Sequence, residues 1–120
     1  MNWISIFFWL LVAHACTDVW WQDVRIIFKK HRLRQLYNSE GQPLPEEPVK
    51  FMEWTPYMLA HALINGAGVA FVTGNVWLGI AETIVHGVTD TLKCEHKIDL
   101  WGDQMTHLVS KLMWAYAVVV

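Results

Sequence analysis

Residues Val76 to Leu92 read VWLGIAETIVHGVTDTL. The run is largely apolar, and its three ionisable side chains, Glu82, His86 and Asp90, follow one another at intervals of four residues. Residues four apart lie on the same face of an α-helix. The stretch therefore predicts a helix that is apolar around most of its circumference and carries its acidic and histidine side chains along one face.

Three other segments share this character, and together with residues 76–92 they predict an all-α protein. They cover about residues 3–21, 57–73 and 103–120. Each is long enough, at about 1.5 Å per residue, to cross the hydrocarbon core of a bilayer. Of the 120 residues, 54% are hydrophobic and eight are tryptophan, which is typical of a membrane protein. We therefore expect one membrane domain, residues 1–120, folded as a four-helix transmembrane bundle.

The basic residues are concentrated between these helices. Eight of the nine lysines and arginines lie in residues 22–55 and 93–99. The positive-inside rule then predicts a multi-pass protein of the inner (cytoplasmic) membrane, with a basic cytoplasmic loop at residues 22–55 and both termini outside. A net charge of −2 gives no electrostatic reason to expect a nucleic-acid partner.

The long loop at residues 22–55 has two interpretations. Apolar residues recur in its first half at roughly helical spacing among basic ones, which suits an amphipathic helix lying at the membrane interface. A solvated extension of the first helix fits equally well. Pro43, Pro45 and Pro48 end any helix in the second half.

Each predicted helix carries one histidine at a matching depth, about five to seven residues from its cytoplasmic end, and three aspartates lie just beyond this layer. A charge exposed to lipid at the centre of a helix costs about 2.5–3.5 kcal/mol on insertion scales. These side chains must therefore face one another. They are His14, Asp18, His61, His86, Asp90, Asp103 and His107.

The sequence also contains an internal repeat. His14 to Asp18 and His86 to Asp90 both read His-x-x-Thr-Asp, and each is followed by a helix with a histidine about five residues in. Two helix hairpins would then enter the membrane in the same direction, as parallel repeats around an axis along the membrane normal. The histidines and aspartates of both halves would meet on that axis.

Imidazole together with carboxylate suits a divalent transition metal, Zn²⁺, Mn²⁺ or Fe²⁺, better than Ca²⁺ or Cu⁺. Seven candidate ligands are enough for one or two ions with open positions for water, as in a metal-dependent hydrolase. Glu82, or an aspartate that does not bind metal, is the candidate catalytic base. Glu82, Asn65 and Gln104 are also candidates for hydrogen bonds that orient the ligands.

Two other interpretations of the polar layer stay open. The side chains can hydrogen-bond across the helices without any metal. They can also carry protons or ions, although the outward halves of the helices hold few ionisable residues besides Lys111, which counts against a continuous path. His31 and His96 fall in polar loops and are excluded from the predicted site.

Four motifs in order resemble one known family. They are LLVAHACTD at Leu10–Asp18, LAHALI at Leu59–Ile64, the histidine and aspartate of His86–Asp90, and DQMTH at Asp103–His107. The chain resembles the small bacterial and phage integral membrane proteins called domain of unknown function 3307, except in its basic loop. It is similar, more distantly, to membrane-bound metal-dependent hydrolases. The resemblance implies the four-helix fold and the histidine–aspartate site.

Together these features predict a membrane-embedded metal-binding protein that hydrolyses an ester or phosphoester of a lipid or other membrane-proximal substrate at the cytoplasmic face. The alternative is a non-enzymatic phage or bacterial protein that binds a host membrane protein through its basic loop, with a structural metal or a polar core. Small residues in the second and third helices can also bring copies of the chain together as a homo-oligomer. These are Gly66, Ala67, Gly68 and Gly79.

Overall fold

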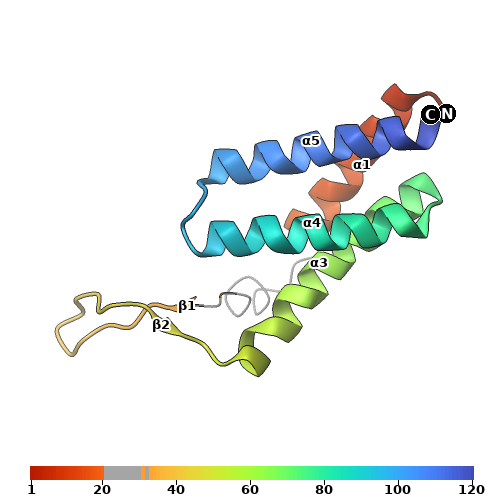
Figure 1. Ribbon diagram of the computed structural model, residues 1–120. Coiled ribbons are helices and arrows are strands. Elements are labelled where there is room, and N and C mark those ends of the chain that lie inside the picture. Colours follow the sequence, from red (N-terminus) through yellow and green to blue (C-terminus); the bar gives the residue numbers. More distant parts are fainter. Residues whose placement is uncertain (21–30, 32) are drawn as a thin grey trace.

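The computed structural model describes residues 1–20, 31 and 33–120. The helices are α1 (Trp3–Ala15), which runs directly into a π-helical turn, η1 (Cys16–Trp20), followed by α3 (Phe51–Thr73), α4 (Val76–Cys94) and α5 (Leu100–Val119). Two short strands, β1 (Leu33–Arg34) and β2 (Glu47–Pro48), pair antiparallel. The prediction of an all-α protein is thus confirmed, and the termini lie together at one end of the helices (Figure 1).

Local sequence signals explain where the helices begin and end. Asn2 caps α1 by accepting a hydrogen bond from the backbone N–H of Ser5, and Asn75 does the same for α4 at Trp77. Gly74 ends α3 in the left-handed conformation, with φ of 67°, which glycine adopts without strain. The break expected between residues 73 and 76 is therefore present, and α3 and α4 form a tight hairpin.

The described helices do not bear out the transmembrane prediction. Among the described residues, no helix combines the length and the apolar character needed to cross a membrane. The predicted four-span bundle, and with it the multi-pass inner-membrane location with its termini outside, is therefore wrong. The first segment ends its α-helix after 13 residues, while α4 carries Glu82, Asp90 and Lys93 and α5 carries Asp103 and Lys111.

The loop at residues 22–55 differs from its prediction where it is described. From residue 33 to residue 48 it is an extended hairpin, closed by the β1–β2 pair and a further bridge between Tyr37 and Pro43. The first half of the predicted amphipathic helix lies outside the described residues. The second helix begins at Phe51, upstream of the expected residue 57, and includes Pro56 in its early turns.

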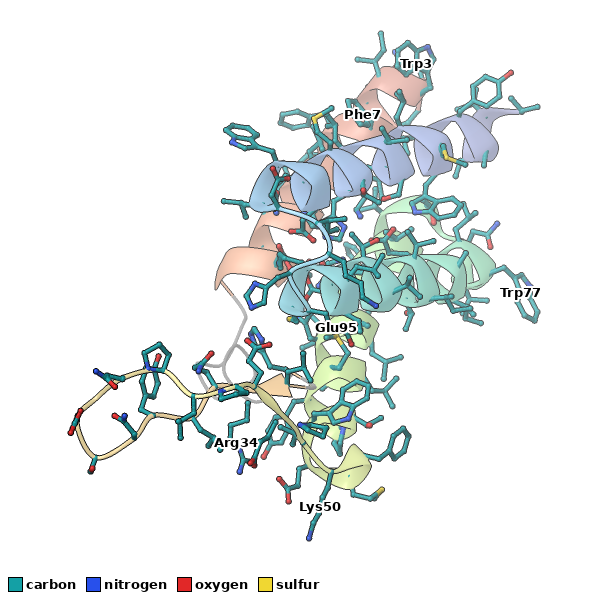
Figure 2. The ribbon with its side chains drawn as sticks, turned by 60° about the vertical axis from the view of Figure 1, so that its left-hand side comes forward. Trp3, Phe7, Arg34, Lys50, Trp77 and Glu95 are labelled. Atoms are coloured by element: carbon teal, nitrogen blue, oxygen red, sulfur yellow. The ribbon has the colours of Figure 1, made fainter. Side chains whose placement is uncertain are left out.

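The side chains buried between the helices are mostly polar, and many of the exposed side chains are apolar. Phe71 is 89% exposed and Trp77 is 74% exposed, and Trp77 projects away from the helices in Figure 2. Apolar side chains pack together chiefly in a small cluster of α1, α3 and α5, near the end where the termini lie. Its buried members are Ile6, Leu10, Val69 and Ala115.

Gly66 of α3 and Gly79 of α4 allow their helices to approach closely. A Cβ added at Gly79 would lie 2.7 Å from the carbonyl oxygen of Gly66 and 2.7 Å from Cβ of Ala70. We expect Gly79→Ala to lower the free energy of unfolding by about 1–3 kcal/mol, because overpacking pushes the helices apart. Chemical denaturation measures the loss. The matched control is Gly87→Ala in the same helix, where the added Cβ meets Ala62 at an ordinary 3.5 Å. Equal stability of the two variants would contradict the close approach.

Candidate metal centre

All seven predicted ligands lie in one cluster between the helices. Each helix contributes, and both His-x-x-Thr-Asp segments direct their histidine and aspartate into it. Five of the seven side chains are almost completely buried, and only those on α1 and η1 are slightly exposed, at 12% and 13%. The contributions are His14 from α1, Asp18 from η1, His61 from α3, His86 and Asp90 from α4, and Asp103 and His107 from α5.

Asp18, His61 and His86 form the first group of potential ligands. Nε2 of His61 lies 3.3 Å from Oδ1 of Asp18 and 2.9 Å from Nε2 of His86, and Nε2 of His86 lies 3.5 Å from the same aspartate oxygen. A tetrahedral ion with bonds of about 2.0–2.1 Å holds neighbouring ligand atoms roughly 3.3 Å apart. These three atoms therefore already have the spacing that one such ion requires.

Asp90, Asp103 and His107 form a second group, which shares no residue with the first. Nε2 of His107 lies 3.2 Å from Oδ1 of Asp103. His86 connects the two groups, because its ring stacks on that of His107 with 4.3 Å between centroids. His14 lies against the same stack, 4.8 Å from the His107 ring. Buried histidine, aspartate and glutamate side chains are thus arranged so that they could hold a metal ion.

Lys93 closes the outer margin of the second group, a role that the sequence did not suggest. Its Nζ lies 2.9 Å from Oδ1 of Asp90 and 3.0 Å from Oδ2 of Asp103. The other oxygen of each aspartate faces a histidine, Asp90 at 2.9 Å from His61 and Asp103 at 3.2 Å from His107. Lys93 therefore holds both carboxylates with one oxygen turned inward. The three-residue spacing of Asp90 and Lys93 was the available signal.

Glu82 occupies the inner end of the cluster. Its Oε1 accepts a hydrogen bond from Nζ of Lys111 at 2.5 Å, and its Oε2 accepts one from Nε1 of Trp114 at 2.6 Å. Nδ1 of His86 lies 3.5 Å from Oε1. Lys111 is only 1% exposed although it bears a charge. The sequence placed Glu82 in the site but missed Lys111 and Trp114 as its partners.

The other predicted polar residues lie around this core. The amide of Gln104 donates to Oδ2 of Asp103 at 3.1 Å, as expected of a residue that orients a ligand. Asn65 accepts a hydrogen bond at 2.8 Å from the hydroxyl of Thr17, the residue that precedes Asp18. The Asn65 amide also donates a hydrogen bond to the backbone carbonyl of His61. His96 pairs with Glu46 outside the cluster, in agreement with its exclusion.

The electrostatics of the cluster favour the ligating forms of His14 and Asp18. Burial and the nearby Lys111 lower the pKa of His14 to about 4, so its ring is neutral at physiological pH. Burial alone would raise the pKa of Asp18, but hydrogen bonds with His61 and His86 outweigh it and lower that pKa, which keeps the carboxylate ionised. Neutral imidazole and ionised carboxylate are the forms that bind metal ions.

The pKa of His86 shifts in the opposite direction from that of His14. Burial opposes a charged ring, but Asp18 and Glu82 outweigh this and raise the pKa of His86. A cation between Asp18, His61 and His86 would compete with that proton for the same ring and carboxylate.

The search for related proteins found no matching protein-family model, curated protein or solved structure. The resemblance to domain of unknown function 3307 stays a prediction.

Proposed function

We propose that this chain is a metal-dependent hydrolase that cleaves an ester or phosphoester at a centre of two divalent transition-metal ions. The observation that carries the proposal is the presence of two groups of potential ligands, Asp18–His61–His86 and Asp90–Asp103–His107, which share no residue. Each group combines imidazole with carboxylate, a donor set that suits Zn²⁺, Mn²⁺ or Fe²⁺. His14, beside His86 and His107, can complete either group.

The surroundings of the cluster suit hydrolysis. Two ions would polarise the ester and lower the pKa of a water molecule, which is the chemistry that such centres supply. Water then adds to the phosphorus or carbonyl carbon, the ester bond breaks, and an acid and an alcohol leave. Burial of His61, Asp90 and Asp103 excludes bulk solvent from the inner side. Access lies at the partly exposed His14, Asp18 and Lys93.

A second candidate is a non-enzymatic protein whose cluster is a polar core or a structural metal site. One observation favours it: two lysines already form ion pairs with three of the carboxylates. Lys93 pairs with Asp90 and Asp103, and Lys111 pairs with Glu82. Such pairs satisfy buried charges without a metal.

Metal content separates these functions. We expect purified wild-type protein, analysed by mass spectrometry without chelators, to carry about two equivalents of a transition metal, and His86→Ala/His107→Ala to carry none. His96→Ala is the matched control, because this exposed histidine lies outside the cluster. A chromogenic aryl phosphodiester and an aryl ester then test for hydrolysis. Metal without turnover of either substrate favours the structural site, and metal-free wild-type protein favours the polar core.

A further inference from the structure

We infer that Glu82 is a positioning residue: Lys111 and Trp114 hold its carboxylate beside Nδ1 of His86, which presents Nε2 of His86 to a metal ion. The inference rests on the proposed metal centre. Of the two roles that the sequence left open for Glu82, catalytic base and orientation of a ligand, it selects the second, and it gives Lys111 and Trp114 a function.

A glutamate beside a metal centre can bind the metal, act as a base or orient a ligand. The contacts of Glu82 favour the last role. Each oxygen already accepts a short hydrogen bond, one from the Lys111 ammonium at 2.5 Å and one from the Trp114 indole at 2.6 Å. Metal binding would bring a cation next to the ammonium and break one of these bonds. A base needs an oxygen that reaches water, and Glu82 is 0% exposed.

The two nitrogens of the His86 ring face different partners. Nδ1 lies 3.5 Å from Oε1 of Glu82, one helical turn earlier in α4. Nε2 lies 2.9 Å from Nε2 of His61 and 3.5 Å from Oδ1 of Asp18. A carboxylate beside one nitrogen retains the proton there and leaves the lone pair on the other nitrogen for a metal. Nδ1 of His86 makes no hydrogen bond with any residue that the structure describes, and with an ion on Nε2 its N–H would donate across this 3.5 Å gap to Glu82, which favours the tautomer that can bind an ion in the first group.

Helix α5 supplies the parts that keep Glu82 in place. His107, Lys111 and Trp114 are spaced by four and three residues, so they share one face of the helix. The same face therefore carries a potential ligand and both donors to Glu82. The pair of Glu82 with Lys111 is neutral overall and almost fully buried, so it orients His86 without adding net charge to the metal centre. This accounts for a buried lysine at the inner end of the cluster.

Cobalt(II) binding tests the inference, because the d–d absorption bands of cobalt report the geometry of its ligands. The variants are Glu82→Gln and Trp114→Phe. Their matched controls are Glu53→Gln at an exposed glutamate of α3 and Trp101→Phe at an exposed tryptophan of α5. We expect Glu82→Gln to bind as many equivalents as wild type, with affinity weakened about 10–100-fold, as for other partners of metal ligands, and with shifted bands. Trp114→Phe should shift the bands in the same direction by less.

Each other outcome has a distinct meaning. Loss of one cobalt equivalent in Glu82→Gln would make Glu82 a ligand, and unchanged affinity and bands with lost hydrolysis would make it a base; both overturn the inference. Unchanged affinity, bands and hydrolysis overturn it as well. Wild-type protein that binds no cobalt refutes the proposed function itself. If Glu82→Gln does not fold, Glu82→Gln/Lys111→Met, which removes both buried charges, takes its place with the same expected weakening and band shift.

Discussion

Replacing His86 with alanine is expected to lower the rate of metal-dependent ester or phosphoester hydrolysis by more than about 100-fold, the upper range for loss of a residue that only supports a ligand. His86 belongs to the first group, with Asp18 and His61, and it also lies next to Glu82 and His107. Its ring also stacks on His107. Removing His86 therefore takes one ligand from the first group and removes the ring that stacks on His107 of the second group.

The rate is measured with a chromogenic aryl phosphodiester at saturating Zn²⁺ or Mn²⁺, and metal content is determined on the same samples. We expect the variant to retain about one equivalent, held by Asp90, Asp103 and His107. His96→Ala serves as the control and should match wild type in both measurements. A His86→Ala protein with wild-type rate and two equivalents would remove His86 from the centre and with it the proposed first group.

Lys111→Met is expected to lower the free energy of unfolding by about 3–5 kcal/mol, the range for removing one partner of a buried ion pair. The cause is not the lost attraction itself. Glu82 is fully buried, and without Lys111 its carboxylate would stay charged in the interior with Trp114 as a remaining donor. Methionine fills a similar volume, so the loss reports the unpaired charge rather than a cavity.

Reversible chemical denaturation measures this loss, and a double-mutant cycle isolates its cause. Glu82→Gln/Lys111→Met removes both charges and should recover most of the stability. Arg34→Met is the control, because Arg34 and its partner Glu53 are both exposed, and removing a charge from a surface pair changes stability by about 0–1 kcal/mol. A double variant no more stable than Lys111→Met would show that the damage comes from packing and not from charge.

The candidate site could be predicted largely from local spacing. His86 and Asp90, and Asp103 and His107, are each four residues apart within one α-helix, which places each pair on one face whatever it packs against. His14 and Asp18 have the same spacing, but Asp18 lies in the π-helical turn. Burying an ionisable group raises the free energy unless the group is paired with another polar group. The pairs on different helices are therefore expected to contact one another. The structure brings all of them together.

The partners of these residues could not be predicted in the same way. Lys93 lies among the polar residues at the end of α4, and a basic residue at such a position is usually a solvated charge. Lys111 and Trp114 are separated from Glu82 by 29 and 32 residues, and no local pattern connects them. Only the packing of α5 against α4 decides that this lysine and this tryptophan share one carboxylate.

The transmembrane prediction failed for different reasons in different segments: α3, α4 and α5, with 23, 19 and 20 residues, are long enough but not apolar enough, whereas the first α-helix is too short. Residues 3–21 are apolar enough, but the α-helix in that segment stops at Ala15 and continues as a π-helical turn. Such a turn adds one residue to the hydrogen-bonded ring and changes the face on which the following side chains lie. Asp18 lies in this turn, next to His61 and His86. A hydropathy pattern does not predict this contact.

By itself the sequence determined the helices within residues 3–15, 57–73, 76–92 and 103–119 and the faces that carry histidine and aspartate, because four-residue spacing acts within one helix. The tertiary structure alone decided which carboxylate oxygens turn inward, which lysines neutralise them, and how the seven side chains divide into groups. Those choices depend on distances of about 3 Å between atoms of different helices, and such distances arise only when the helices pack.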